Sequence, residues 1–181
     1  MKVLDAKFLK KFLKTATDQL AGDWVLIGGT LLPALGIDHR VTTDIDMISL
    51  QREQSSKLNL QLMELAEQQG LPAESINQAA AYFLEKIPHY RKSLVLLQEG
   101  KKGKIFRPNA TLYLLLKIKR MSESDFSDCI HWLKWMRKQK EKLDIEVVLK
   151  NIEIEKSKSN ESPSKFQYLI QLSEALRVSN D

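Results

Sequence analysis

The stretch that decides the fold is GGTLLPALGIDHRVTTDIDM, residues 28–47. It follows a short apolar run, residues 24–27, that predicts a buried strand ending in the double-glycine turn. A short helix is expected over residues 30–35, because Gly36 is typical of a helix end. The alternating residues 44–48, DIDMI, predict a second strand.

Asp44 and Asp46 lie two residues apart in this predicted strand, so the period of two places both carboxylates on one face. Two carboxylates about 5 Å apart repel by roughly 3 kcal/mol at an effective dielectric constant near 20. A strand tolerates that repulsion where solvent or a cation accompanies the pair. Mg²⁺ suits hard oxygen ligands together with substrate phosphates. We therefore predict that Asp44 and Asp46 bind Mg²⁺.

The glycine turn predicts the phosphate-binding half of the same pocket. Gly28 and Gly29 let the backbone approach a ligand closely. A helix that begins at Thr30 presents unpaired N–H groups to an anion, and the Thr30 hydroxyl is expected to cap that helix or to donate to a phosphate. Arg40 adds a cation near the acidic strand. A glycine turn or an Asp-x-Asp pair is common alone, but their combination on adjacent strands favours a phosphate-and-metal pocket.

The rest of the chain predicts an α+β core followed by helices. The apolar spacing and the turn residues predict the following elements: helices over 4–20, 53–69, 72–86, 109–121 and 124–139, and strands over 93–97 and 104–107. The expected organisation is a core of residues 1–108, a helical portion of residues 109–154 packed on the core, a flexible linker of residues 155–165, and a C-terminal helix of residues 166–181.

Lys117 interrupts a helix that is otherwise apolar nearly all round. A buried ammonium group must meet an anion, so Lys117 is expected to contact an NTP phosphate or an active-site aspartate; the alternative is a side chain that reaches solvent. In the next helix, Asp125 fits a capping box that begins at Ser122. Asp128 is not explained by capping, which makes it the better functional candidate.

These motifs resemble the signature of nucleotidyltransferase-fold proteins, and above all that of the bacterial abortive-infection toxin group. The first matching segment contributes Gly28, Gly29, Thr30, Arg40, Thr42, Asp44 and Asp46. The second contributes Lys117 and the Asp125-x-x-Asp128 pair, so the resemblance covers roughly residues 20–140. It implies a mixed sheet flanked by helices.

The resemblance also implies a role for each matching residue. The nucleotide would be bound by the following residues: Gly28, Gly29, Thr30, Arg40, Thr42 and Lys117. The carboxylates of Asp44 and Asp46 would hold a two-metal Mg²⁺ site. Asp44, Asp46, Lys117 and Asp128 would together be catalytic.

The activity that the resemblance implies is transfer of a nucleoside monophosphate from an NTP. The acceptor would be a hydroxyl of RNA, with tRNA as one candidate, or of a protein. A bacterial toxin with an antitoxin partner is the biological setting that it suggests. Two other interpretations stay open. The first is a degenerate member that binds nucleotide or a protein partner without turnover, because the predicted strand 93–97 lacks the third carboxylate of many relatives and Glu99 falls in the predicted turn. The second is an RNA-binding adaptor that uses the basic hairpin and the helical tail.

Composition is consistent with this prediction. The chain has 181 residues and a formal net charge of +5, which favours polyanions such as NTP or RNA. It has one cysteine, Cys129, so no internal disulfide can form, as expected in a reducing cytoplasm. No apolar run approaches the ~20 residues that cross a bilayer, so no membrane partner is expected.

Overall fold

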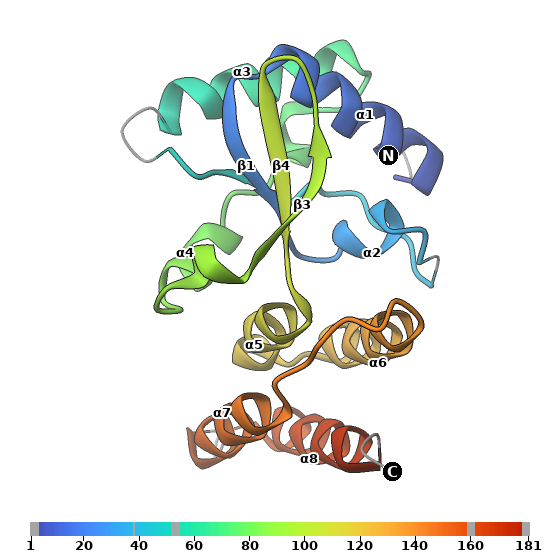
Figure 1. Ribbon diagram of the computed structural model, residues 1–181, viewed down its shortest axis with the longest axis vertical. Coiled ribbons are helices and arrows are strands. Elements are labelled where there is room, and N and C mark those ends of the chain that lie inside the picture. The colour runs from blue at the N-terminus through green and yellow to red at the C-terminus, as the bar shows by residue number, and fades with distance from the viewer. Residues whose placement is uncertain (1–3, 38, 52–54, 159–161, 179–181) are drawn as a thin grey trace. The chain divides into compact units, whose positions relative to one another are not determined.

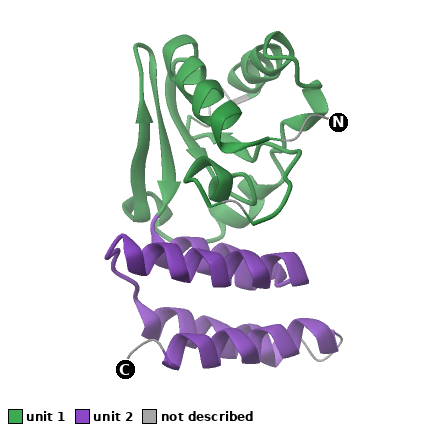
Figure 2. Cartoon of the chain, turned by 90° about the vertical axis from the view of Figure 1, so that its right-hand side faces the viewer, with its two compact units in different colours: residues 1–108 green, residues 109–181 purple. Residues whose placement is uncertain are grey.

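The computed structural model describes residues 4–37, 39–51, 55–158 and 162–178. It divides the chain into two compact units, residues 1–108 and 109–181 (Figure 2). The first unit is mixed α and β and the second is helical, so the predicted α+β class is confirmed. The elements of the first unit are α1 (Ala6–Gln19), β1 (Gly22–Leu26), α2 (Leu31–Ala34), β2 (Met47–Ser49), α3 (Ser55–Gln68), η2 (Ala73–Ser75), α4 (Ala80–Glu85), η3 (Tyr90–Ser93), β3 (Leu94–Glu99) and β4 (Gly103–Pro108).

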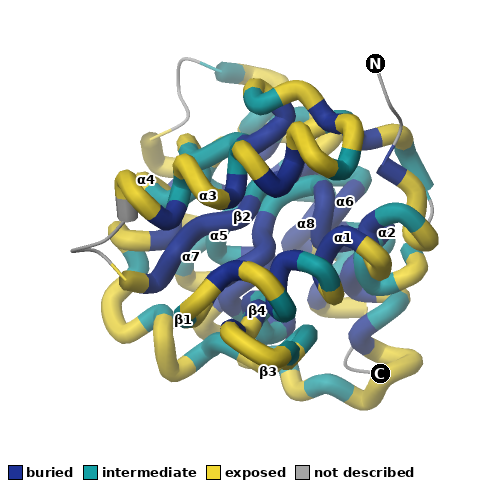
Figure 3. The backbone as a smooth tube through the Cα atoms, turned by 90° about the horizontal axis from the view of Figure 1, so that it is seen from above, coloured by how far each residue is buried: buried dark blue, intermediate teal, exposed yellow. Residues whose placement is uncertain are grey.

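A four-stranded mixed sheet in the order β2-β1-β4-β3 forms the centre of the first unit. Figure 1 labels β1, β4 and β3 of this sheet. Strand β1 pairs antiparallel with β2 and parallel with β4, and β3 pairs antiparallel with β4. The carboxyl ends of β1 and β4 therefore lie at the same edge of the sheet as the start of β2. Strands β1 and β2 are largely buried, whereas β3 is a more exposed edge strand (Figure 3).

Helix α1 packs on the sheet through one apolar face. Its first turn is capped by Asp5, whose Oδ1 accepts a hydrogen bond of 2.7 Å from the Phe8 N–H. Leu9, Phe12 and Leu13 are buried on that face. The helix contacts β4, β3 and α2. Its polar face, which carries lysines, is exposed.

The segment after α2 differs from the predicted strand of residues 44–48. Regular pairing starts only at Met47, and Asp44 and Asp46 lie in the extended segment just before β2. Between them, Ile45 forms a parallel bridge to Ile76. The two carboxylates therefore lie at the entrance to the strand.

The helix predicted over residues 72–86 is wrong, because that segment is broken in the middle. It contains the 3₁₀ turn η2 and the short helix α4, with Ile76 extended between them. The break is fixed by backbone hydrogen bonds to a distant segment: Ile45 N–H donates to Ser75 O at 2.6 Å, and Asn77 N–H donates to Ile45 O at 3.0 Å. This pairing joins segments about 30 residues apart, so the local pattern of apolar residues does not indicate it. The helix predicted from residue 53 begins at Ser55, and residues 53–54 lie outside the described part of the chain.

The β3–β4 hairpin is present as predicted, but its turn is shorter. Glu99 belongs to β3 and forms a 3.0 Å ion pair with Lys104 of β4, so its placement in the turn was wrong. The tip of the hairpin is held against the end of α1. The Lys102 N–H donates to Thr17 O, and the Lys101 N–H donates to Asp18 Oδ1, both at 3.0 Å.

The described residues of the second unit form four helices: α5 (Ala110–Arg120), α6 (Glu123–Lys138), α7 (Ile145–Lys158) and α8 (Pro163–Arg177). Its core contains stacked aromatic rings, with the centroids of Tyr113 and Trp132 4.2 Å apart. Helix α7 runs to Lys158 and α8 begins at Pro163, so most of the linker predicted over residues 155–165 is helical. Residues 159–161 of that linker lie outside the described part of the chain. None of the helices in the described ranges is long and apolar enough to cross a membrane.

Candidate functional site

The double-glycine turn at the carboxyl end of β1 closes against two side chains of the 40–46 segment. Gly28 adopts φ +68°, a left-handed conformation that favours glycine, and a Cβ atom there would overlap the Asp46 carboxylate. A Cβ atom on Gly29 would overlap the Arg40 guanidinium. Because the two glycines lack a Cβ atom, they leave room for the side chains of Asp46 and Arg40.

Asp46 is held from several directions. Its carbonyl accepts a hydrogen bond of 2.9 Å from the Ile27 N–H, which continues the pairing of β1 with β2. Its own N–H donates to Thr30 Oγ1 at 3.4 Å, and its Oδ1 accepts a hydrogen bond of 2.7 Å from the Asn77 side-chain amide. The carboxylate is thus fixed in place before any ligand arrives, as a metal-binding site requires.

Thr30 links the glycine turn to the acidic segment. Its side chain is fully buried, and its hydroxyl donates to the backbone carbonyl of Asp44. The predicted cap is wrong, because Thr30 makes no side-chain hydrogen bond to α2, a helix of only four residues. The described hydroxyl contacts join Thr30 to the backbone of Asp44 and Asp46, and its contact with a phosphate stays a prediction.

Asp44 and Thr42 differ in exposure. Asp44 is exposed, and its Oδ1 accepts a 3.2 Å hydrogen bond from the hydroxyl of Thr43. Thr42 is buried, and its carbonyl accepts a 3.1 Å hydrogen bond from the Leu4 N–H. Leu4 directly precedes the Asp5 cap of α1, so the start of α1 lies beside the candidate site.

Asn77 is the residue of this site that the sequence did not predict. Its Oδ1 accepts a 2.9 Å hydrogen bond from the Ala79 N–H, which orients the amide so that Nδ2 faces Asp46. Asparagine commonly accepts a hydrogen bond from the backbone two residues on, and this contact is typical of turns. That preference was the local signal for a break before α4, and it was hidden by the predicted helix of residues 72–86.

No third carboxylate reaches the site from the described sheet. Glu99 pairs with Lys104 at the turn end of the hairpin. Leu94 and Pro108 pair at its other end. Five residue-to-residue steps along β3 separate Glu99 from Leu94, a distance of about 17 Å. The residues of β4 nearest the carboxyl end of β1 are Phe106, Arg107 and Pro108, none of them acidic.

The second predicted segment forms a buried charge cluster inside the helical unit. Lys117 Nζ donates to Asp125 Oδ1 at 2.9 Å and to Asp128 Oδ2 at 2.6 Å, and its side chain is only 6% exposed. The prediction that Lys117 meets an anion is confirmed, and the alternative of a side chain reaching solvent is wrong. Arg120 adds two hydrogen bonds to Asp125, of 2.6 and 2.7 Å, in a bidentate arrangement.

Asp125 also forms the predicted capping box. Its backbone N–H donates to Ser122 Oγ and its carboxylate accepts from the Ser122 N–H, each at 3.2 Å. Burial opposes the charge of Asp125, yet the hydrogen bonds from Arg120 and the charge of Lys117 hold the pKa of Asp125 well below its usual range. Burial likewise opposes the charge of Lys117, but Asp125 and Asp128 raise the pKa of Lys117 above its usual value. Asp125 and Lys117 are therefore both charged at neutral pH.

The predicted site residues thus form two groups, one in each unit. The first unit brings together Gly28, Gly29, Thr30, Arg40, Asp44 and Asp46, with Thr42 close by in sequence. The second unit brings Lys117 to Asp128. Within the described ranges no three His, Cys, Asp or Glu side chains gather as a metal site, so the carboxylates available to a metal at the first group are Asp44 and Asp46. The catalytic, nucleotide-binding and metal-binding roles of these residues stay predictions.

Comparison with known proteins identifies the family. No curated protein matches the chain significantly, and neither does any solved structure. One family model matches residues 2–173, nearly the whole chain, and it is described as a nucleotidyltransferase of unknown function (DUF6036). The match includes the glycine turn, the acidic segment and the Lys117 cluster. The chain belongs to this family of nucleotidyltransferases.

Proposed function

We propose that this protein transfers a nucleoside monophosphate from an NTP to an acceptor hydroxyl, with Mg²⁺ held by Asp44 and Asp46. The observation that carries the proposal is the fixed geometry of Asp46. Its carboxylate lies over Gly28 and is held by Asn77, at the end of β1 where the double-glycine turn begins. A site that serves only a local turn does not need a carboxylate positioned by a segment 31 residues away.

The donor set fits Mg²⁺. The ion takes hard oxygen ligands, commonly one or two carboxylates together with substrate phosphates. Asp44 is exposed and Asp46 half-buried, so both lie within reach of solvent and of a ligand. When bound, Mg²⁺ neutralises the phosphate charge that builds up during transfer and orients the nucleotide.

The remaining residues of the first group have distinct parts in the proposal. Arg40, whose guanidinium lies against Gly29, provides a cation for the triphosphate. Thr30 and Asn77 act as positioning residues for the acidic segment. The acceptor hydroxyl attacks the α-phosphorus and gives up its proton to solvent. The bond between the α-phosphorus and the oxygen that bridges to the β-phosphate breaks, and pyrophosphate leaves.

The finer biological assignment rests on the motif resemblance. On that basis the protein is proposed to be a bacterial toxin of a toxin–antitoxin or abortive-infection system, with an antitoxin as its protein partner. The cytoplasm, where NTP and Mg²⁺ are available, is the proposed location. Catalytic roles for Lys117 and Asp128 have the same basis.

A second candidate function is nucleotide binding without turnover. The observation that favours it is the position of Glu99, which lies at the far end of the described sheet and is paired with Lys104. The strands of the sheet then supply no general base for the acceptor. Under this interpretation Mg²⁺ and NTP stabilise the protein in a thermal shift measurement, and no product forms.

Label transfer from α-³²P NTPs tests the proposal. The purified chain is incubated with Mg²⁺ and an extract containing RNA and protein. The expected result is a labelled acceptor with the wild type and none with Asp46→Ala. Asp23→Ala is the matched control, because Asp23 is exposed at the opposite end of β1. Equal labelling by wild type and Asp46→Ala contradicts the proposal, and nucleotide binding without label in any fraction supports the second candidate.

A further inference from the structure

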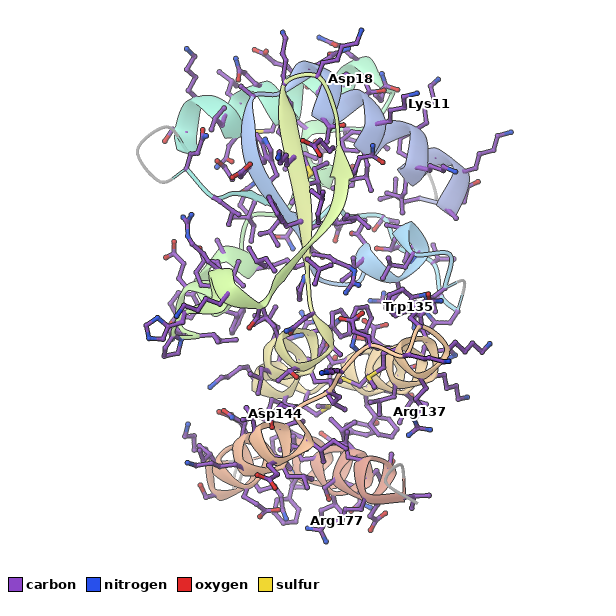
Figure 4. The ribbon with its side chains drawn as sticks, viewed as in Figure 1. Lys11, Asp18, Trp135, Arg137, Asp144 and Arg177 are labelled. Carbon is purple, nitrogen blue, oxygen red and sulfur yellow. The ribbon has the colours of Figure 1, made fainter. Side chains whose placement is uncertain are left out.

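Four lysines form a stripe along the exposed face of α1. Lys7, Lys10, Lys11 and Lys14 are all exposed, and Lys11 extends outward from the helix (Figure 4). Their i, i+3, i+4 and i+7 spacing places them within an arc of about 100°. No carboxylate among the described residues forms an ion pair with any of them. Like charges at this spacing destabilise a helix, so the stripe carries a cost that an external anion would remove.

The stripe continues onto the hairpin tip. Lys101 and Lys102 are exposed, and their backbone N–H groups donate to Asp18 Oδ1 and Thr17 O at the end of α1. Lys104 is excluded from the track, because Glu99 forms an ion pair with it and Asp23 also lies near it. The six lysines and Asp18 carry a net charge of +5, which equals the formal net charge of the whole chain. This surface is therefore strongly basic.

The position of the stripe connects it with the candidate site of the same unit. The N–H of Leu4, just before α1, donates to Thr42 O within the 40–46 segment. Lys7 follows one turn later, and Lys14 lies about 10 Å farther along the helix axis. The basic track thus begins beside the acidic segment and leads away from it to the hairpin tip.

The residues on this face argue against a lipid bilayer and against a protein as its ligand. The apolar side of α1 is buried in the first unit through Leu9, Phe12 and Leu13, so the helix has no free apolar face to insert into a bilayer. Protein interfaces are rich in aromatic side chains and poor in lysine at their core. The exposed large apolar residues of the described chain include none on α1. A repeating row of cations matches a repeating row of phosphates.

We propose that the surface formed by Lys7, Lys10, Lys11, Lys14, Lys101 and Lys102 binds the phosphodiester backbone of an RNA acceptor and leads its end to the Asp44–Asp46 segment. The role as acceptor site rests on the proposed nucleotidyl transfer. The binding itself does not. Because lysine contacts phosphate as a point charge, recognition is independent of base sequence.

The test compares two variants of equal net charge. In one, Lys7, Lys10, Lys11 and Lys14 are replaced by glutamine. In the control, four exposed lysines of the helical unit are replaced by glutamine: Lys134, Lys138, Lys140 and Lys142. Glutamine keeps a helix propensity close to that of lysine, and thermal unfolding checks that both variants are folded. Fluorescence anisotropy with a fluorescein-labelled 20-nucleotide single-stranded RNA of mixed sequence measures affinity without NTP or Mg²⁺.

The α1 variant is expected to bind this RNA at least about tenfold more weakly at 0.15 M salt, and the control variant within about twofold of wild type. The slope of log K against log salt should fall in magnitude from about 4 to about 1.5, because about 0.7 is lost for each phosphate contact. Unchanged affinity in the α1 variant, or equal loss in both variants, overturns the proposal.

Label transfer separates this proposal from the proposed function. If the α1 variant labels RNA as well as wild type does, or if the label enters only protein, the role of this surface as the RNA acceptor site is wrong while nucleotidyl transfer stands. If neither wild type nor any variant labels an acceptor, and only the α1 variant loses RNA affinity, the surface is supported as an RNA-binding site. The proposed transfer reaction is then wrong.

Discussion

The protein contains two acidic pairs of similar sequence spacing in very different surroundings. Asp125 and Asp128 are buried, and Lys117 and Arg120 neutralise them through contacts of 2.6 to 2.9 Å. Asp44 is exposed and Asp46 is half-buried, and one contact of the Asp46 carboxylate is the hydrogen bond from the side-chain amide of Asn77. Burial explains the difference, because an uncompensated charge inside a protein costs several kcal/mol. The buried pair must carry its own cations, whereas a pair that reaches solvent can take a cation from outside.

The largest expected effect is on the stability of the buried pair. Asp128→Ala leaves Lys117 undercompensated and should lower the free energy of unfolding by about 3–5 kcal/mol. Asp44→Ala removes an exposed carboxylate and should change it by less than about 0.5 kcal/mol. Urea unfolding of both variants measures the difference, and equal losses would show that the two pairs do not differ as described.

The support of Asp46 by Asn77 gives the next largest effect. Asn77→Ala should raise the Mg²⁺ concentration for half-maximal thermal stabilisation by NTP about tenfold, as expected when a partner of a metal ligand is lost. Gln78→Ala is the control, because Gln78 donates to the backbone carbonyl of Met47 at 2.8 Å and not to a carboxylate. The same shift in both variants would assign the effect to the backbone of this segment.

Gly29→Ala should act through Arg40. The added Cβ displaces the guanidinium, which is the far end of a flexible side chain, so stability changes little while the apparent Kd for NTP rises roughly fivefold, about 1 kcal/mol. Gly36→Ala is the control: nothing lies within 4 Å of its Cβ position, and its φ of +77° costs stability only. Isothermal titration with NTP and Mg²⁺ measures both. An unchanged Kd in Gly29→Ala would remove Arg40 from the triphosphate site.

The smallest effect is the pH dependence of the buried cluster near neutrality. The folded-state pKa of Asp125 is depressed, so its contribution to stability is present above its unfolded pKa of about 3.9 and is lost as pH falls below that value. The pKa of Lys117 is raised, so its contribution is present below about 10.4 and is lost at higher pH. The difference in unfolding free energy between wild type and Asp125→Asn should therefore be constant from pH 5 to about pH 9. A steep change in that interval would contradict the ion pairing.

The same contrast explains what the sequence could predict. The glycine turn, the Asp-x-Asp spacing and the need of Lys117 for an anion are local features with a direct physical meaning, and each was visible in the residue pattern. Asn77 was missed because its role depends on the bridge between Ile45 and Ile76, which joins segments about 30 residues apart. The Thr30 hydroxyl was assigned to its own helix because its bond to the Asp44 carbonyl also depends on tertiary packing.

Thermal unfolding tests most directly whether Asp44 and Asp46, and not the buried Asp125 and Asp128, hold the metal and the nucleotide. Thermal unfolding of wild type, Asp46→Asn and Asp128→Asn is followed with NTP at increasing Mg²⁺ concentration. We predict that the Mg²⁺-dependent rise in Tm disappears in Asp46→Asn and persists in Asp128→Asn from that variant's own lower baseline. Persistence in Asp46→Asn together with loss in Asp128→Asn would contradict the account.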